Sequence, residues 1–391
     1  MKVLFVHDGT LKYDITNGKY FGTAVTPNSL SRYKYLSDDI SIMIRTYPFK
    51  EGESRDRYTE IPTEYNIIHV DNYMNLKGWF FERSKVKELV RATVQNMDLV
   101  ICRFSGETGK IAARICQEIN KPYIVECVGC QWDAFWNYNW KGKILAPFMA
   151  YSQRQIIKQA PYVIYVTNQF LQKRYPTNGK SIGASNVELL PMDEANLQKR
   201  INKINSKSDR IFTLGTASAI DVPYKGQAYV MKAMSILKKE GYNIKYQIAG
   251  AGSKTYLENI AKRLGVENDV QFVGVLPHAK VFEWVDDLDL YIQPSDQEGL
   301  PRALIEAMSR ACPAIGSSTA GIPELLDKEA IFKRKHVDEL IKVMRLMLDK
   351  QQFLKHAKLN FETALSYQRD VIYQRRNKFY DMVLKEQNLV K

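Results

Sequence analysis

Ser295-Asp-Gln-Glu-Gly-Leu-Pro-Arg-Ala-Leu-Ile-Glu-Ala-Met-Ser309 is the most informative stretch of this chain. An apolar run at 289–293 leads directly into it, and two prolines and a glycine then interrupt the backbone. From Pro301 onward the apolar residues recur at helical spacing, and proline is well tolerated in the first turn of a helix. The sequence therefore predicts a strand, a tight loop and a helix, with Glu298 in the loop and Glu306 in the helix.

This arrangement suits a ligand that carries both phosphate and hydroxyl groups. The free N–H groups and the dipole of a helix N-terminus favour an anion such as phosphate. Gly299 lets the backbone approach that anion closely. The carboxylates of Glu298 and Glu306 are unsuitable partners for phosphate, but they accept hydrogen bonds from sugar hydroxyls. A phosphate flanked by two such acids describes a nucleotide sugar.

Glu298-x7-Glu306, followed by Cys312-Pro-Ala-Ile-Gly-Ser-Ser-Thr-Ala-Gly-Ile-Pro-Glu-Leu325, resembles the donor-site signature of family 4 of the retaining glycosyltransferases. The resemblance implies the α/β fold called GT-B, in which two Rossmann-like, doubly wound domains face a cleft. It implies that Glu306 holds the ribose hydroxyls of the nucleotide. Glu298 and the backbone of Gly299, Leu300 and Pro301 would face the donor sugar and its diphosphate. The alternative is an ordinary amphipathic helix with a solvated Glu306, which the surrounding Gly-Leu-Pro and Gly-Ile-Pro-Glu disfavour.

Further donor-binding residues are implied earlier in the second half of the chain. Lys225 matches a lysine that contacts the donor diphosphate, although a surface lysine at a turn is the alternative. Its ammonium would stabilise the charge that builds on the departing nucleotide. Gly250 and Gly252 lie in a glycine loop that a tight strand-to-helix turn explains equally well. Leu276 belongs to a loop that lies beside the base in relatives. Thr216 stands where relatives often carry an arginine.

The first half of the chain alternates strands and helices, which predicts a parallel sheet covered on both faces. Ligands of such sheets bind at the carboxyl ends of the strands, where we expect Gly9 and Arg103 on the acceptor side. Trp132 is a further acceptor-side candidate, since its ring stacks either on a sugar or in the core. Many relatives carry a histidine near here, and this chain has none. The catalytic candidates are therefore Lys225 and Glu298, with the acids Glu126 and Asp133 available to replace the histidine.

The predicted domain order follows from these patterns. We expect an acceptor-side domain at 1–190, a polar linker at 191–208 and a donor-binding domain at 209–367. The charged stretch 368–391 is expected to be a helix that crosses back to the first domain, as the GT-B fold implies.

The composition indicates which kinds of partner the protein can bind. The chain has 391 residues and a net charge of +13, which suits an anionic partner. No motif of a sequence-reading nucleic-acid module is present, so a phosphorylated substrate or an acidic lipid surface is favoured. Aromatic and basic residues around Trp79-Phe80-Phe81 tilt the prediction towards peripheral association with a membrane, with a core-facing helix as the alternative.

The N-terminus is a short strand and does not resemble a signal peptide. No run approaches the ~18 apolar residues of a spanning helix, so we expect a cytoplasmic protein. The five cysteines are irregularly spaced, and Cys127-x2-Cys130 has no second pair to complete a zinc site. We expect neither a metal nor a cofactor.

These features predict a metal-independent, retaining hexosyltransferase. It would move a sugar from a nucleotide sugar, with UDP favoured, to a glycan or lipid-linked acceptor of a surface polysaccharide. No protein nucleophile is evident, so the acceptor hydroxyl would attack on the face that the diphosphate leaves. The alternatives are a nucleotide-sugar epimerase of the same fold and a non-catalytic scaffold that binds nucleotide sugars.

Overall fold

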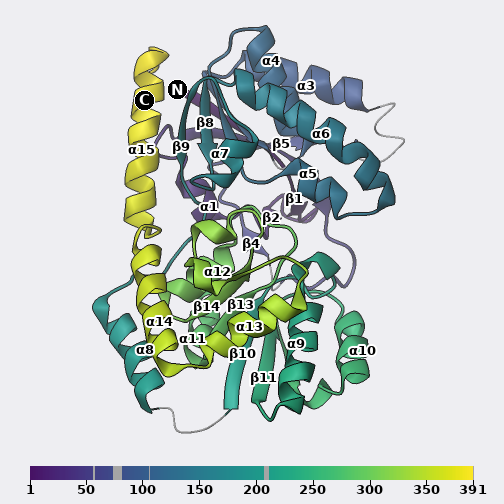
Figure 1. Cartoon of the computed structure of the whole chain (residues 1–391). Coiled ribbons are helices and arrows are strands. Elements are labelled where there is room, and N and C mark those ends of the chain that lie inside the picture. Colours follow the sequence, from purple (N-terminus) through teal and green to yellow (C-terminus); the bar gives the residue numbers. More distant parts are fainter. Residues whose placement is uncertain (56–57, 74–81, 105, 207–210, 391) are drawn as a thin grey trace. The chain divides into compact units, whose positions relative to one another are not determined.

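The computed structural model describes residues 1–55, 58–73, 82–104, 106–206 and 211–390, which form two compact units (Figure 1). The first unit consists of Met1–Gln131, Pro147–Ala184 and Tyr373–Lys391, and the second of Trp132–Ala146 and Ser185–Ile372. The Trp79-Phe80-Phe81 cluster lies outside the described residues. No helix in the described part is long and apolar enough to cross a bilayer.

The first unit is built on a mainly parallel sheet. Its strands are β1 (Lys2–Tyr13), β2 (Tyr20–Gly22), β3 (Asp39–Pro48), β4 (Thr59–Glu60), β5 (Asn66–Val70), β6 (Leu99–Phe104), β7 (Tyr123–Cys127), β8 (Tyr162–Tyr165) and β9 (Lys180–Gly183). The parallel part runs in the order β5-β3-β1-β6-β7-β8-β9, and β2 and β4 pair antiparallel at the edge. Strand order reverses between β1 and β6, as in a doubly wound domain. The central strands are almost fully buried apolar runs, which explains their clear sequence signal.

Helices cover this sheet and connect its strands. They are α1 (Pro27–Ser31), α3 (Arg83–Gln95), α4 (Glu107–Glu118), α5 (Gln131–Trp136), α6 (Trp140–Gln159), α7 (Phe170–Arg174) and α15 (Arg369–Glu386). The division between the two units runs through α6 at Pro147. The N-terminal part of α6 is therefore counted with the second unit.

The second unit contains a parallel sheet in the order β12-β11-β10-β13-β14-β15. Its strands are β10 (Ile211–Ala217), β11 (Asn243–Ala249), β12 (Val270–Gly274), β13 (Leu290–Gln293), β14 (Ala314–Ser317) and β15 (Ile331–Phe332). The order reverses between β10 and β13. In such sheets ligands bind outside the carboxyl ends of the strands at this switch point, and the loops after Ala217 and Gln293 begin there. The predicted fold class, two doubly wound α/β domains, is confirmed.

The helices of the second unit lie on both faces of this sheet. They are α8 (Glu194–Ser206), α9 (Gln227–Lys239), α10 (Thr255–Leu264), α11 (His278–Asp287), α12 (Arg302–Ser309), α13 (Val337–Met347) and α14 (Lys350–Leu365). Four short 3₁₀ turns occur among the described residues: η1 (Pro223–Lys225), η2 (Glu267–Asp269), η3 (Ile322–Glu324) and η4 (Lys328–Ala330).

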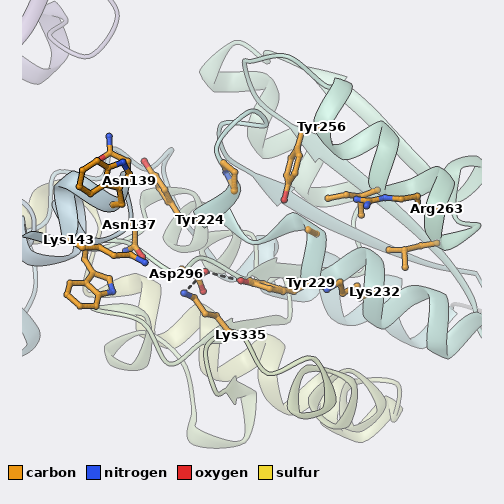
Figure 2. A pocket seen from close by; sticks show the side chains of 16 residues that line it. Asn137, Asn139, Lys143, Tyr224, Tyr229, Lys232, Tyr256, Arg263, Asp296 and Lys335 are labelled. Atoms are coloured by element: carbon orange, nitrogen blue, oxygen red, sulfur yellow. Dashed lines mark hydrogen bonds and ion pairs between the residues drawn. The ribbon is translucent and has the colours of Figure 1, made fainter.

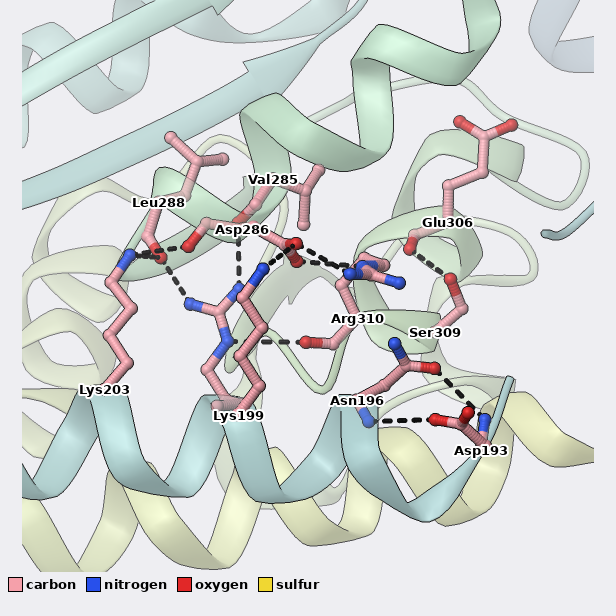
Figure 3. Close-up of polar contacts among 11 residues, drawn as sticks. Asp193, Asn196, Lys199, Lys203, Val285, Asp286, Leu288, Glu306, Ser309 and Arg310 are labelled. Atoms are coloured by element: carbon pink, nitrogen blue, oxygen red, sulfur yellow. Dashed lines mark hydrogen bonds and ion pairs between the residues drawn. The ribbon is translucent and has the colours of Figure 1, made fainter. Parts of the chain in front are cut away.

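The segment 191–208, expected to be a polar linker, contains helix α8, and its described residues belong to the second unit. Figure 3 shows how α8 is held. Buried Arg200 donates to the carbonyls of Val285 and Leu288 at 2.9 and 2.5 Å, at the C-terminal end of α11 where carbonyls need partners outside the helix. Asp286 pairs with Arg310, the residue that ends α12, at 2.6 Å.

Helix α15 completes the first unit from the far end of the sequence. It begins at Arg369, and from Tyr373 onward its residues belong to that unit. In Figure 1 it is the yellow helix beside β8 and β9. Tyr162 of β8 donates to Glu386 at 2.9 Å, and Arg375 donates to the carbonyl of Gly183 at 2.9 Å.

Candidate active site

The loop between β13 and α12 lies at the switch point of the second sheet. Its first residues, Ser295 and Asp296, are almost fully buried. The carbonyl of Ser295 accepts a hydrogen bond of 2.6 Å from the hydroxyl of Ser317. The carbonyl of Gly299 accepts one of 3.0 Å from the N–H of Gly321. The two sequence motifs that carry the family resemblance are therefore joined side by side, and Gly321 fixes the loop before α12.

The N-terminus of α12 carries free backbone donors. Pro301 occupies the N-cap position, and its side chain cannot accept a hydrogen bond. In the part of the chain that the structure describes, no side chain accepts from the amides of 299–303. Two buried side-chain oxygens near this loop, Oε1 of Gln297 and Oγ1 of Thr319, also have no hydrogen-bond partner. Buried polar groups are normally satisfied, so this concentration of unpaired groups marks a place built for a polar ligand.

Lys225 and Glu298 meet beside this loop. The Nζ of Lys225 lies 2.7 Å from Oε1 of Glu298, and both side chains are largely buried. Gln293, the last residue of β13, donates to the same carboxylate oxygen at 3.0 Å and to the hydroxyl of Ser295 at 2.8 Å. Glu298 is thus held by a cation and an amide, and the predicted pair of catalytic candidates is brought together.

A glycine makes this close approach possible. Gly226 follows Lys225 in the left-handed region, with φ of 80°. A Cβ at this position would lie 2.1 Å from the carbonyl oxygen of Pro294. The N–H of Asp296 also donates to the carbonyl of Tyr224 at 2.7 Å. The turn before α9 and the loop after β13 are therefore packed backbone against backbone.

Glu306 faces the loop that precedes α11. The Nε2 of His278 lies 3.4 Å from Oε1 of Glu306, and the carboxylate is mostly buried whereas the imidazole is half exposed. The hydrogen bond to Glu306 raises the pKa of His278 above its usual 6.5, partly offset by burial. Leu276 is half-buried in the same loop, two residues before His278. Glu306 and Leu276, both predicted donor residues, thus lie on elements joined through His278.

Gly250 and Gly252 shape the loop after β11. They have φ of 152° and 125°. A Cβ on Gly250 would lie 1.9 Å from the carbonyl oxygen of Ser218, and one on Gly252 would lie 2.5 Å from the side chain of Asp221. Both glycines therefore let the loops after β10 and β11 pack together, which is the tight-turn explanation left open by the sequence.

In the first unit, α4 follows the switch-point strand as α12 does in the second unit, but a side chain occupies the N-terminus of α4. The carboxylate of Asp8, at the end of the buried part of β1, accepts from the N–H of Thr108 at 3.1 Å and of Gly109 at 3.4 Å. These amides open α4. Burial raises the pKa of Asp8, although the hydrogen bonds from Thr108 oppose the increase. Gly9 follows directly, and its N–H donates to Nδ1 of His7 at 2.5 Å. The anion position of α4 is occupied by the chain's own carboxylate.

Arg103 and Glu126 form part of a buried ionic network. Arg103 contacts Glu126 at 2.8 Å, and Arg376 of α15 contacts the other carboxylate oxygen at 3.1 Å. The hydroxyl of Tyr33 donates to Glu126 at 3.0 Å. Burial alone would raise the pKa of Glu126, but Arg103 and Arg376 outweigh it and lower the pKa to about 2. This carboxylate has its hydrogen-bonding capacity filled by protein groups, so we no longer favour it as a catalytic acid or base.

Trp132 and Asp133 lie in α5. The rings of Trp132 and Trp136 stack at 5.3 Å with an interplanar angle of 13°. Trp132 and Asp133 are half-buried, and Trp136 is 40 % exposed. Trp132 is thus stacked on Trp136, and the Nζ of Lys143 lies over the Trp136 ring, 5.9 Å from its centroid.

Groups with metal-binding chemistry lie elsewhere. Among the described residues, Asp327, Glu329 and His356 bring possible ligand atoms within 4.8 Å of one another. Glu329 already pairs with Lys355. These residues belong to η4, its flank and α14, which hold none of the predicted donor residues. All five cysteines are free and buried.

Several site residues were missed in the sequence. Gln293 positions Glu298, His278 contacts Glu306, Gly226 allows the backbone approach, and Thr319 contributes an unpaired hydroxyl. The position of Gly226 directly after Lys225 and before a helical pattern was a readable signal. Nothing local marks Gln293 or Thr319, because their importance depends on contacts with residues far away in the sequence.

Comparisons with known proteins show the family to which the chain is similar. The sequence profile of the family "Glycosyl transferases group 1" matches residues 195–362. The chain is 36 % identical to protein CapJ of Staphylococcus aureus, over 90 % of this chain and 88 % of CapJ. It is 34 % identical to the amylovoran biosynthesis glycosyltransferase AmsK of Erwinia amylovora, over 26 % of this chain and 27 % of AmsK.

Among solved structures, HepE of Anabaena in complex with UDP superposes with a TM-score of 0.66 at 16 % identity. The match covers 98 % of this chain and 100 % of HepE. At this identity the likeness supports the fold alone, which is GT-B. The matched profile contains the whole 295–325 region with Glu298 and Glu306. The chain therefore belongs to the group 1 glycosyltransferases.

Proposed function

We propose that this glycosyltransferase moves a hexose, with retention of configuration and without a metal ion, from a UDP-sugar to a glycan or lipid-linked acceptor. In this proposal the second unit binds the donor, and the first unit binds the acceptor sugar that receives the transferred hexose. Glu306 holds the ribose hydroxyls, and Leu276 lies beside the base. The diphosphate occupies the N-terminus of α12. Two comparisons support the choice of donor and pathway: HepE is seen with UDP, and AmsK belongs to amylovoran biosynthesis.

The contrast between two helix N-termini carries this proposal. Both follow the switch-point strand of a doubly wound sheet, where anions are expected to bind. At α4 the amides of Thr108 and Gly109 are satisfied by Asp8. At α12 no described side chain takes that place, and Lys225 lies beside the loop. The second unit therefore offers a diphosphate both free amides and a cation.

The ion pair between Lys225 and Glu298 suggests how donor binding proceeds. A diphosphate at the N-terminus of α12 competes with Glu298 for the ammonium of Lys225. Once Lys225 turns to the diphosphate, the carboxylate of Glu298 is free to accept hydrogen bonds from the donor sugar. The ammonium and the helix amides then stabilise the leaving diphosphate as its charge grows. In this proposal the ammonium of Lys225 and the amides of α12 compensate the charge of the leaving diphosphate. The proposed mechanism therefore includes no metal ion.

The transfer also requires that the acceptor hydroxyl is correctly oriented towards the donor sugar. The acceptor hydroxyl attacks the anomeric carbon on the face that the diphosphate leaves, so the configuration is retained. The oxygen of the departing diphosphate takes the proton of the hydroxyl, which makes a dedicated protein base unnecessary. This accommodates the absence of the histidine found in many relatives. Asp133 remains a candidate for a supporting role, since it is half-buried.

The proposed location is the cytoplasmic face of a membrane, where a lipid-linked acceptor would be presented. Helix α6 supports this. Trp140, Ile144, Phe148 and Tyr151 are each at least 60 % exposed and recur at helical spacing on one face. Lys141 and Lys143 accompany this apolar face. Aromatic and basic residues together favour the interface of an anionic bilayer.

The two alternatives receive less support. Membership in a glycosyltransferase family does not favour an epimerase. A scaffold that only binds nucleotide sugars would bind the donor without turnover, so a transfer assay separates it from the enzyme.

Calorimetry with UDP, GDP and ADP, in buffer containing a chelator, tests the donor site. We expect saturable binding of UDP and a loss of about tenfold or more in affinity for Glu306→Ala, because hydrogen bonds to a charged acceptor are worth about 1.5–3 kcal/mol. Lys225→Ala should weaken binding similarly. Glu283→Ala, which changes an exposed acid of α11 outside the proposed site, serves as the control. Unchanged binding in Glu306→Ala would disprove this donor site.

A further inference from the structure

A cavity of about 730 Å³ lies in the second unit beside the Lys225–Glu298 pair, but neither of those residues lines it. Figure 2 shows the side chains that surround it. Asn137, Asn139 and Lys143 lie on one side of the view, and Tyr256 and Arg263 lie on the other. The donor proposal does not use this space.

The walls of the cavity combine aromatic rings with cations. Trp136, Tyr224 and Tyr256 line it, and Trp136 and Tyr256 are 40 % and 42 % exposed. Exposed aromatic faces pack against the C–H faces of sugar rings and of other flat ligands. Aromatic rings that line one cavity are suited to hold a ring-shaped ligand.

Positive charge dominates the lining. Lys143, Lys232, Arg263 and Lys335 line the cavity, against one acid, Asp296. Lys335 lies 3.8 Å from Asp296. Within the described residues, Lys232 and Arg263 have neither a hydrogen bond nor an ion pair. Their charges are therefore available to an anionic group on a ligand.

Asp296 adds a specific hydrogen-bonding position. The residue is only 4 % exposed, and its Oδ2 accepts from the hydroxyl of Tyr229 at 3.1 Å. Its Oδ1 is buried without a partner. An unsatisfied buried carboxylate oxygen costs free energy unless a donor reaches it. A ligand hydroxyl would be such a donor.

These three features select one class of ligand. A neutral sugar would use the rings and Asp296 but leave the cations unpaired. A small inorganic anion would use the cations but leave the rings uncovered and lie near the carboxylate. A sugar that carries a carboxylate or phosphate matches all of them. We propose that this cavity binds an acidic sugar residue of the acceptor glycan.

The position of the cavity supports its assignment to the acceptor, a step that rests on the proposed function. Tyr224 directly precedes Lys225, and Asp296 precedes Glu298 by two residues. The N–H of Asp296 donates to the carbonyl of Tyr224 at 2.7 Å, so the two loops are joined. The same two loops therefore present one pair of residues to the donor and another pair to the cavity. A sugar in the cavity would lie next to the place of transfer.

The test is calorimetry of the full chain with two probes, a tetrasaccharide of alternating glucuronate and N-acetylglucosamine and a galacturonate trisaccharide. The carboxyl methyl esters of both probes are the neutral controls. We expect an acidic probe to bind saturably and its ester to bind about tenfold more weakly or not at all. The double variant Lys232→Gln/Arg263→Gln should reduce the affinity of the acidic probe by about tenfold. Raised salt should weaken binding of the acidic probe to the unaltered protein.

A matched variant controls for net charge. Lys239→Gln/Lys262→Gln removes two charges from the same helices, α9 and α10, outside the cavity, and should leave probe binding unchanged. UDP affinity should be equal in both double variants. Failure of both acidic probes to bind, equal binding of the esters, or equal weakening in the control variant would overturn the inference. Probe binding in a protein that does not bind UDP would uphold the cavity and overturn the proposed donor site.

Discussion

At the scale of single residues, the contact between Lys225 and Glu298 determines how the proposed donor site behaves. The two side chains lie 2.7 Å apart and are mostly buried. A partly buried ion pair of this kind holds both groups until a stronger partner arrives. Gln293 restrains Glu298 further, so the cost of releasing Lys225 is part of the cost of donor binding.

Replacing Glu298 with glutamine should therefore separate nucleotide binding from transfer. Without the carboxylate, Lys225 no longer has a competing anion, and the repulsion between Glu298 and a diphosphate disappears. We expect Glu298→Gln to bind UDP several-fold more tightly, and its transfer rate to fall by about tenfold or more. Calorimetry and a transfer assay measure the two effects. Weaker UDP binding in this variant would contradict competition for Lys225.

A second residue, Glu126, should reveal its structural role through pH. Its pKa is lowered to about 2 in the folded chain from 4.5, so its stabilising effect is complete above pH 4.5 and is lost as the pH falls to about 2. Glu126→Gln should be less stable by about 3–5 kcal/mol at pH 7, because the arginines lose their anion. The difference should shrink between pH 4.5 and 2.

Urea unfolding at a series of pH values measures this difference in stability. UDP affinity of the folded variant at pH 7 should be unchanged, since Glu126 belongs to the first unit. A variant with normal stability but lost transfer would instead return Glu126 to the catalytic candidates.

At the scale of elements, the turn before α9 and the loop before α12 act as one assembly. Hydrogen bonds join Asp296 to Tyr224 and Gly321 to Gly299, and Gly226 packs against the backbone of Pro294. The lysine and the helix amides proposed to bind the diphosphate come from different elements. Their relative position therefore depends on these backbone contacts more than on either helix alone.

Gly226→Ala tests that dependence. An alanine here must adopt φ near 80° and place its Cβ against a backbone carbonyl that cannot move aside easily. Gly241 has φ of 90° with no atom within 4 Å of its built Cβ, so Gly241→Ala isolates the backbone strain, about 1–2 kcal/mol. We expect Gly226→Ala to cost clearly more in urea unfolding and to weaken UDP binding. Equal costs for the two variants would show that the approach to Pro294 is not tight.

Local sequence patterns identified regular strands and helices. They failed for features that depend on contacts between residues far apart in the sequence. The buried strand and helix around 289–309 were readable because apolar spacing and proline placement agree there. Helix α8 was taken for a linker because its Asn- and Lys-rich sequence masks the buried positions Leu197 and Ile204, seven residues apart. The pairing of Glu126 with Arg376 was unreadable, since the two residues are 250 positions apart.

At the scale of the whole molecule, both units contain a doubly wound sheet, but different groups lie at the switch points of the two sheets. Each has a switch point with a helix N-terminus beside it. Asp8 fills that position in the first unit, whereas no described side chain fills it in the second. The sequence motifs that resemble the family most clearly lie in the second unit, where we propose that the donor binds.

The membrane attachment that we propose should depend on helix α6. Phe148 and Tyr151 are 70 % and 66 % exposed, and burying such rings in a bilayer interface gains free energy in proportion to area. We expect cosedimentation with phosphatidylglycerol vesicles, weaker binding to phosphatidylcholine, and a several-fold loss in Phe148→Ser/Tyr151→Ser. Val275→Ser, at a position 63 % exposed in the second unit, is the control. Equal vesicle binding by all three proteins would exclude this face.

The position of α15 has a consequence for biosynthesis. The first unit needs residues from Tyr373 onward, yet a ribosome adds these only after the whole of Ser185–Ile372. Until then the nascent chain holds Glu126 and Arg103 without Arg376, while Ser185–Ile372 is already complete enough to fold. Translation that stops before Tyr373 would yield an intact second unit joined to an unfinished first unit. Cellular quality control would meet such a product as an incompletely folded protein.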